Sequence, residues 1–202
     1  MDRVGQAAKI INALPVASVL DVGCRDQVLQ KHLRPTVSYA GLDVHPVNGR
    51  PRYVGDLMKL DIAERFDCVA ALDVVEHTDD PYAFFDRLVS LARKYLLVSL
   101  PNCYSLYHKW SFLFHDSMGE KYVFMREMPN DRHKWVMNCA EIAQFFQHRA
   151  LANDCGVEIV RLTYTHGHRH PVHPITLRNR VLLATLPKDW LTHTMLAVFT
   201  KH

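Results

Sequence analysis

Hydrophobic and polar residues form alternating blocks over the first hundred positions of the chain. Short apolar runs have the length and composition of β-strands, and between them apolar residues recur at the intervals of a helix. The predicted strands are 19–22, 39–44, 53–57, 66–75 and 95–100, and the predicted helices between them are 4–14, 28–33 and 82–94. Strands that alternate with helices in this way are typical of a doubly wound α/β fold with a parallel sheet.

The pattern is less regular beyond this region. A helix is predicted over 140–152, and strand-like runs at 157–163 and 191–199 form a final strand pair. The 66–75 run is almost wholly apolar, which is typical of a central parallel strand that is covered on both faces. A chain of 202 residues suits one α/β domain with a well-buried core, so we predict a single domain over 1–202.

Three acidic residues follow the first three predicted strands. Gly23 forms the turn after the first strand, where a glycine lets the backbone pass close to a ligand and the next helix offers free N–H groups. Asp43 ends the second strand about 20 residues later, where a carboxylate can accept hydrogen bonds from a ribose diol. Together with Asp21 and Asp56, it indicates a ligand at the carboxyl edge of the sheet, although each acid could instead cap a turn.

The sequence around these residues resembles that of class I S-adenosylmethionine (SAM) dependent methyltransferases. Asp21-x-Gly23 matches the start of the first family motif, Asp/Glu-x-Gly-x-Gly-x-Gly, but Cys24 to Gln27 supply none of the later glycines and Arg25 stands where that family has glycine. The block from Phe66 to Pro81, followed by a strand that ends in Pro-Asn, resembles the fourth and fifth motifs. The similarity is greatest to the ubiquinone-pathway O-methyltransferase branch, and the motifs span 18–102.

The resemblance implies a Rossmann-like methyltransferase fold, with a mostly parallel seven-stranded sheet and an antiparallel edge strand. It also implies SAM as the cofactor. Asp56 would then accept from the adenine amine, Leu57 would pack on the adenine ring, and the segment from Asp73 would lie beneath the methyl group. The cofactor-binding residues that we predict are Asp21, Gly23, Asp43, Asp56, Leu57 and Asp73.

Two histidines are the candidate catalytic residues. A hydroxyl acceptor loses its proton as it is methylated, and a neutral imidazole can take that proton near pH 7. We predict this role for His77, which follows the fourth strand, and for His133, with His77 ahead. In related ubiquinone-pathway and small-RNA enzymes a Glu-x-x-Glu-His at this place holds a divalent metal, and the alternative ligand set here is Asp73, Glu76, His77 and His133. We favour the metal-free base, because Asp73 is one methylene shorter than glutamate.

Residues 102–130 are long for a connection and rich in aromatic side chains. We interpret this segment as a lid that binds the acceptor, with equal weight on a helical flap that packs on the core. The N-terminus lacks the apolar centre of a signal peptide, and no apolar run has the roughly 18 residues of a membrane span. The five scattered cysteines form no Cys-x-x-Cys pair, so a cytoplasmic protein with free thiols is expected.

Three functional hypotheses fit this sequence. The leading one is a SAM-dependent methyltransferase that acts on an oxygen, in preference to a nitrogen, of a small-molecule, sugar or lipid-linked acceptor. The second is a metal-assisted methyltransferase of RNA 3′ ends, but a net charge of +3 is too small to indicate nucleic acid. The third is a non-catalytic protein with the methyltransferase fold, which the missing glycines would suit.

Overall fold

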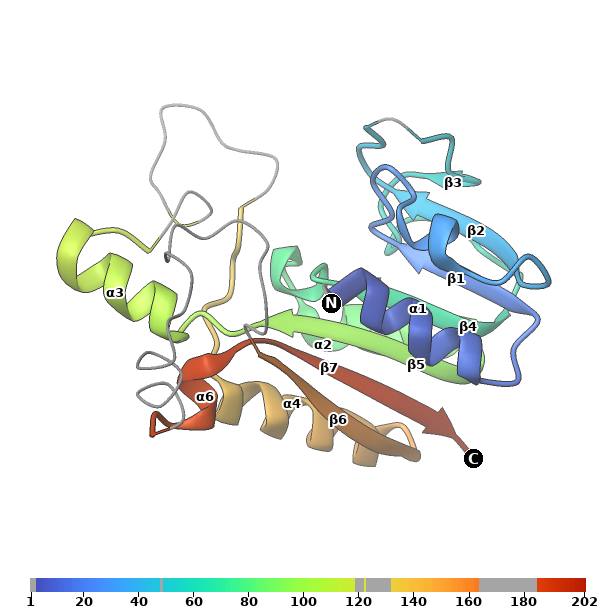
Figure 1. The fold of residues 1–202 in the computed structure, drawn as a ribbon. Coiled ribbons are helices and arrows are strands. Elements are labelled where there is room, and N and C mark those ends of the chain that lie inside the picture. The colour runs from blue at the N-terminus through green and yellow to red at the C-terminus, as the bar shows by residue number, and fades with distance from the viewer. Residues whose placement is uncertain (1–2, 48, 119–121, 123–131, 164–184) are drawn as a thin grey trace.

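A twisted sheet of seven strands, in the order β3-β2-β1-β4-β5-β7-β6, forms the centre of the computed structural model (Figure 1). The structure describes residues 3–47, 49–118, 122, 132–163 and 185–202. Neighbours among the first five strands are parallel, whereas β7 is antiparallel to both β5 and β6. The strands are β1 Ser18–Val22, β2 Ser38–Asp43, β3 Tyr53–Val54, β4 Phe66–Leu72, β5 Ala92–Pro101, β6 Cys155–Thr163 and β7 Thr192–Lys201. The predicted seven-stranded, mostly parallel sheet with an antiparallel edge is therefore confirmed.

Helices cover both faces of this sheet, as a doubly wound fold requires. The α-helices are α1 Arg3–Ala13, α2 Pro81–Leu91, α3 Leu106–His115, α4 Cys139–Ala152 and α6 Lys188–Leu191, and the 3₁₀ helices are η1 Leu29–His32 and η2 Val75–His77. On one face, Ile11 of α1 and Leu29 of η1 pack with small apolar residues of β1 and β4. On the other face, α2 and α4 bury large rings, among them Phe85 and Phe146, against the sheet.

Local sequence signals fix where α2 and α4 begin. The Asp80 carboxylate accepts hydrogen bonds from the first backbone N–H groups of α2, and Pro81 occupies its first turn. Asn138 and Glu141 form a reciprocal capping box at the start of α4. The prediction that α2 extends to residue 94 was wrong, because Ala92 already pairs with Phe66 of β4 and is fully buried there.

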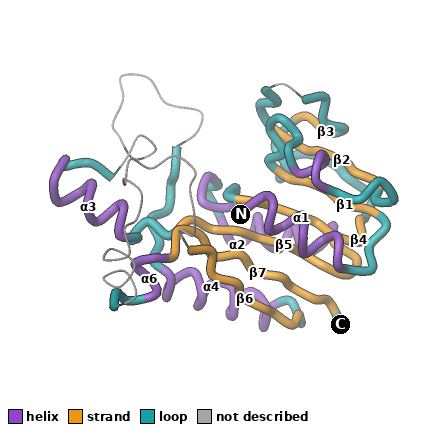
Figure 2. Tube along the Cα trace, viewed as in Figure 1, coloured by secondary structure: helices purple, strands orange, loops and turns teal. Residues whose placement is uncertain are grey.

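The helix predicted over 28–33 is reduced to η1, a single 3₁₀ turn between β1 and β2 (Figure 2). Gln27 has a left-handed backbone, with φ +57°, and therefore cannot belong to a right-handed helix. Pro35 follows shortly after and disfavours a helical conformation for the residue before it. The few residues between these two positions cannot form a stable α-helix. The expected helix N-terminus beside the cofactor is therefore absent from this described loop.

The described part of 102–130 contains α3, which buries none of its own residues. Its aromatic side chains Trp110, Phe112 and Phe114 are all exposed, and the Trp110 and Phe114 rings lie 4.1 Å apart. Residues 119–121 and 123–131 lie outside the described residues, so the lid stays a prediction. No helix in the described part of the chain is both long and apolar enough to cross a bilayer.

Candidate functional site

Gly23, directly after β1, occupies a position that only glycine fits. Its φ is +74°, and a Cβ atom there would lie 2.5 Å from Cγ2 of Val74, which follows β4. The sequence indicated a glycine that admits a ligand. The geometry shows in addition that the glycine lets two neighbouring loops at the carboxyl edge of the sheet pack closely.

Arg25 and Gln27 stand where the family motif has its second and third glycines, and both have left-handed backbones. Their φ angles are +47° and +57°. The loop after β1 thus keeps the backbone shape of a glycine-rich turn although it carries large side chains there, at a cost of order 1 kcal/mol or more for each residue. The Gln27 side chain also accepts a hydrogen bond from the Arg50 N–H at 3.1 Å, which ties this loop to the one after β2.

Asp43, at the end of β2, holds the same loop in place. One carboxylate oxygen accepts from the Arg25 N–H and the other from the His45 N–H, each at 2.7 Å. A carboxylate has about four acceptor positions, so two remain for other donors. The predicted ribose acceptor is therefore already engaged in two backbone hydrogen bonds, and it also anchors the loop that would border the ligand.

Asp21 is a buried acid in β1, with 4% of its surface exposed. The Tyr39 hydroxyl donates to it at 2.7 Å. Burial raises the pKa of Asp21 to about 7, with a smaller upward contribution from Asp43, and the Tyr39 hydrogen bond opposes the rise. Near neutral pH this carboxyl group is consequently divided between its charged and neutral forms.

A cavity of about 320 Å³ lies beside these residues. Its lining includes Asp21, Gly23 and Arg25, together with Arg3 from α1 and Leu72 from the end of β4. Of the six predicted cofactor residues, Asp21 and Gly23 line this cavity, whereas Asp43, Asp56, Leu57 and Asp73 do not. Asp56 accepts a hydrogen bond from the Met58 N–H at 3.0 Å in a turn, and Leu57 is buried in the hydrophobic core with 2% of its surface exposed. Their predicted contacts with adenine stay predictions.

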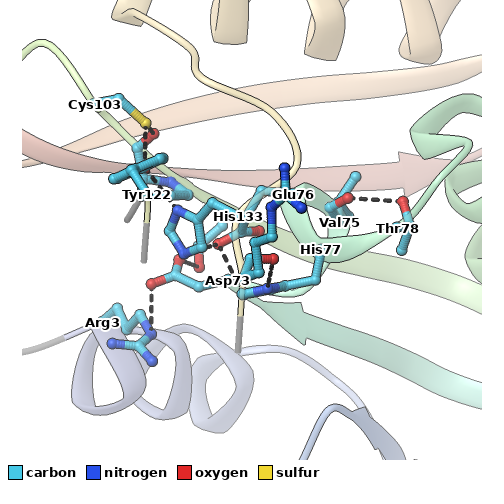
Figure 3. Close-up of polar contacts among 12 residues, drawn as sticks. Arg3, Asp73, Val75, Glu76, His77, Thr78, Cys103, Tyr122 and His133 are labelled. Carbon is cyan, nitrogen blue, oxygen red and sulfur yellow. Dashed lines mark hydrogen bonds and ion pairs between the residues drawn. The ribbon is translucent and has the colours of Figure 1, made fainter. Parts of the chain in front are cut away.

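Asp73 does not join the other predicted metal ligands, because its carboxylate is engaged by other side chains (Figure 3). Its carboxylate forms an ion pair with Nε of Arg3 at 2.9 Å and accepts a hydrogen bond from the Ser99 hydroxyl at 2.6 Å. Its backbone is left-handed, with φ +57°. No sequence motif indicated Arg3, which reaches Asp73 from α1 at the start of the described sequence.

Glu76, His77 and His133 do come together (Figure 3). Nε2 of each histidine lies close to Oε1 of the fully buried Glu76, at 3.9 Å for His77 and 3.8 Å for His133. The two imidazole rings meet edge to face with centroids 4.7 Å apart. Each of these three side chains offers one possible ligand atom, and these atoms all lie within 4.8 Å of one another. No other group of three or more histidine, cysteine or acidic side chains in the described ranges meets this distance. Three of the four residues in the alternative ligand set therefore lie together in space, and their role as metal ligands stays a prediction.

Hydrogen bonds orient both imidazole rings. Nδ1 of His77 donates to the carbonyl oxygen of Arg132 at 2.8 Å, so in the neutral ring Nε2 carries the lone pair. Nδ1 of His133 contacts the Tyr122 hydroxyl at 2.7 Å, and that hydroxyl also contacts Sγ of Cys103 at 2.8 Å. Burial raises the pKa of Tyr122 well above its usual range, so the phenol keeps its proton. Such outer hydrogen bonds to Nδ1 are typical of metal-ligating histidines.

Comparisons with known proteins identify sequences that are similar to this chain. A family model described as "Methyltransferase domain" matches residues 2–156. The ubiquinone biosynthesis O-methyltransferase of Rhodopseudomonas palustris (strain BisA53) is 26% identical over 160 residues, which cover 71% of this chain and 62% of that protein. The enzyme of the same name from Bradyrhizobium sp. (strain ORS 278) is 28% identical over 142 residues, covering 63% of this chain and 54% of the relative. The matched region thus spans little more than half the length of these relatives.

Solved structures share the fold at low sequence identity. The small RNA methyltransferase HEN1 superposes with a TM-score of 0.65 at 19% identity, covering 99% of this chain and 25% of that one. The plantazolicin methyltransferase BpumL in complex with SAH gives a TM-score of 0.61 at 13% identity, covering 98% of this chain and 82% of that one. At these identities the similarity is one of fold.

The left-handed backbone of Arg25 predicts an inverted order of stability between two variants. Arg25→Gly should be more stable than Arg25→Ala by about 1 kcal/mol, because alanine keeps the cost of this backbone shape and glycine does not. Urea unfolding of both variants measures the difference. The same pair of substitutions at Arg93, an exposed residue of β5, should show the ordinary order with alanine ahead. A glycine variant at position 25 that is the less stable of its pair would contradict this backbone geometry.

The raised pKa of Asp21 predicts a pH-dependent stability. The unfolded chain loses this proton near pH 4 and the folded chain near pH 7, so the stabilisation from the protonated carboxyl group is complete below pH 4 and is lost as pH rises through 7. Asp21→Asn cannot titrate. Its stability relative to wild type should therefore increase between pH 4 and 7, by at most about 1.4 kcal/mol per pH unit, and then level off.

Chemical denaturation at each pH measures this difference. Asp61→Asn, at an exposed position, is the matched control and should change the unfolding free energy by less than about 0.5 kcal/mol throughout. A constant difference between Asp21→Asn and wild type from pH 4 to 8 would show that Asp21 has an ordinary pKa in the folded protein.

Proposed function

Because the chain belongs to the class I SAM-dependent methyltransferase family, we propose that it moves a methyl group from SAM to an oxygen of a small-molecule acceptor. The family model covers residues 2–156, which include every strand from β1 to β5 and the helices packed on them. The observation that carries the proposal is the convergence of Asp21, Gly23 and Arg25 on one cavity at the carboxyl edge of the parallel strands. Ligands bind at this edge in open α/β sheets.

We propose that the cavity takes the amino-acid part and the ribose of SAM. Ionised Asp21 would accept from the ammonium group, and Arg25 or Arg3 would pair with the carboxylate, since all three side chains border the same space. Asp43 would use its two remaining acceptor positions for the ribose hydroxyls. In this role the carboxylate holds both the ligand and the loop beside it.

For the transfer itself, we propose His77 as the base. Its Nδ1 donates to the Arg132 carbonyl, so the lone pair of the neutral ring is on Nε2, which would accept the proton, and the Glu76 carboxylate 3.9 Å away would stabilise the imidazolium that results. His133, held by Tyr122, approaches the same oxygen of this carboxylate at 3.8 Å. Beyond this proton transfer, alignment of acceptor and methyl group supplies the rate.

A second candidate is metal-assisted transfer to the 3′ end of an RNA, and the geometry of the cluster favours it. Glu76, His77 and His133 fit a divalent cation, since both Nε2 atoms face one buried carboxylate and both Nδ1 atoms have partners. Such an ion would act as a Lewis acid that stabilises a deprotonated hydroxyl. Asp73 would contribute only after leaving Arg3 and Ser99. Among solved structures, the HEN1 small RNA methyltransferase shares the fold.

Cofactor binding tests the proposed function. Wild type should bind S-adenosylhomocysteine in calorimetry, and Asp43→Asn should bind it about tenfold to a hundredfold more weakly, because the amide offers the ribose fewer acceptor positions and loses one backbone donor. Asp61→Asn, exposed and outside the cavity, should bind as wild type does. If the wild-type protein binds neither SAM nor S-adenosylhomocysteine, the proposed function is wrong and the non-catalytic hypothesis is the one that remains.

Chelation separates the base from the metal. With His77 as a metal-free base, turnover should persist after treatment with EDTA, and His77→Ala should cost about 10²–10⁴ in rate while cofactor affinity stays near wild type. His32→Ala, an exposed histidine on η1, is the control. Activity that EDTA abolishes and Mg²⁺ or Mn²⁺ restores would instead establish the metal-assisted candidate. Unchanged turnover in a variant that lacks both His77 and His133 would remove both roles.

A further inference from the structure

A second cavity, of about 270 Å³, lies against Glu76. It is bordered by the first two residues of η2, the end of β5, the start of α2, the segment 135–137 and the first half of α4. The chain from Leu72 to Glu76 therefore borders both cavities, since Leu72 lines the first and Glu76 lines the second. A molecule in the second cavity would reach the Glu76 cluster from the side away from α1.

Three aromatic side chains form much of the wall of this cavity: Tyr82, Trp135 and Phe145. The rings of Tyr82 and Phe145 meet edge to face at 5.4 Å. Nε1 of Trp135 donates to the Thr78 carbonyl oxygen at 2.9 Å, which fixes the orientation of the indole. The walls thus present fixed π-systems, whose faces carry partial negative charge.

The charged residues of the lining are both acidic. Glu76 is fully buried, and Glu141 is held by its capping box, with Oε2 accepting from the Asn138 N–H at 2.8 Å. Among the described residues that line the cavity, none is a lysine, arginine or histidine. The nearby Arg149 guanidinium stacks 5.2 Å from the Tyr82 ring but pairs with Asp86 at 3.2 Å, so its charge is offset locally.

We infer that this cavity binds an organic cation, an ammonium group carried on a compact apolar body. Aromatic faces attract cations through their quadrupoles, and two carboxylates add Coulomb attraction, whereas a phosphate-bearing ligand would be repelled by both acids. We infer further that this cation is part of the methyl acceptor and that the reacting oxygen of the acceptor points to the Glu76 cluster. Only this second step rests on the proposed function. The cation is an anchoring group, since a protonated or quaternary nitrogen has no lone pair to methylate.

Three probes that share one ring test the charge preference: benzyltrimethylammonium, benzyl alcohol and benzylphosphonate. Each is titrated into EDTA-dialysed, ¹⁵N-labelled protein while the indole signal of Trp135, assigned with Trp135→Phe, is followed by NMR. We expect benzyltrimethylammonium to shift this signal and to bind about tenfold more tightly than benzyl alcohol. Benzylphosphonate should leave the signal unchanged.

Two variants locate the source of this preference. Glu141→Gln keeps an oxygen for the Asn138 N–H, so α4 stays capped. This variant should bind benzyltrimethylammonium about threefold more weakly and benzyl alcohol with unchanged affinity. Tyr82→Leu keeps apolar surface but removes a ring, and should likewise lower the affinity for benzyltrimethylammonium and not that for benzyl alcohol. Glu158→Gln, on an exposed position of β6, should change neither.

The outcomes separate this inference from the proposed function, because the titrations contain no SAM. Equal binding of the cation and benzyl alcohol would reduce the cavity to a general apolar site and overturn the inference, as would no response to any probe. Stronger binding of benzylphosphonate would also overturn it and would favour a phosphate-bearing acceptor such as an RNA end. Each of these results can occur whether or not S-adenosylhomocysteine binds in the first cavity.

Discussion

The carboxylate of Asp43 joins the two loops after β1 and β2, which border the first cavity. Each of its oxygens accepts one backbone N–H, from Arg25 after β1 and from His45 after β2. The loop after β1 contains two left-handed residues that are not glycine, and such a conformation persists only where its surroundings enforce it. The hydrogen bond to the Arg25 N–H supplies part of that enforcement, and the Gln27 side chain supplies another part through Arg50. The hydrogen bonds of a buried acid thus help to hold a backbone shape that the family motif obtains from glycines.

A similar arrangement assembles the histidine cluster from distant parts of the chain. The segment from Arg132 to Trp135 lies along η2, where the Lys134 N–H donates to the Glu76 carbonyl and Lys134 Nζ contacts Asp79 at 2.6 Å. These contacts bring His133 beside Glu76 and at the same time place Trp135 in the wall of the second cavity. One docked segment therefore contributes to both the Glu76 cluster and the second cavity.

Sequence patterns were sufficient for the sheet because they reflect periodic burial. The apolar run of β4 and the Asp80-Pro81 cap of α2 are local signals, and both elements begin where those signals lie, although β4 ends at Leu72 and not at the predicted residue 75. The partners of the predicted site residues were harder to predict, because they come from distant parts of the chain. Asp73 was expected near the cofactor or a metal, but its partner Arg3 comes from α1 and carries no motif. The retained left-handed shape at Arg25 was likewise hidden, because a sequence shows the missing glycine and not the tertiary hydrogen bonds that compensate for it.

The position of β7 between β5 and β6 has a consequence for how the protein is made. β7 is synthesised after every other strand, yet it pairs with both of these neighbours, and Lys201 at its end donates to the Val89 and Ala92 carbonyls at the end of α2. Until β7 emerges from the ribosome, β5 has one open edge and β6 has no partner in the sheet. A nascent chain with open strand edges is prone to aggregate. The part of the sheet around β5 and β6 is therefore the part most exposed to wrong pairing during synthesis, although the loops between β1 and β4 are already complete.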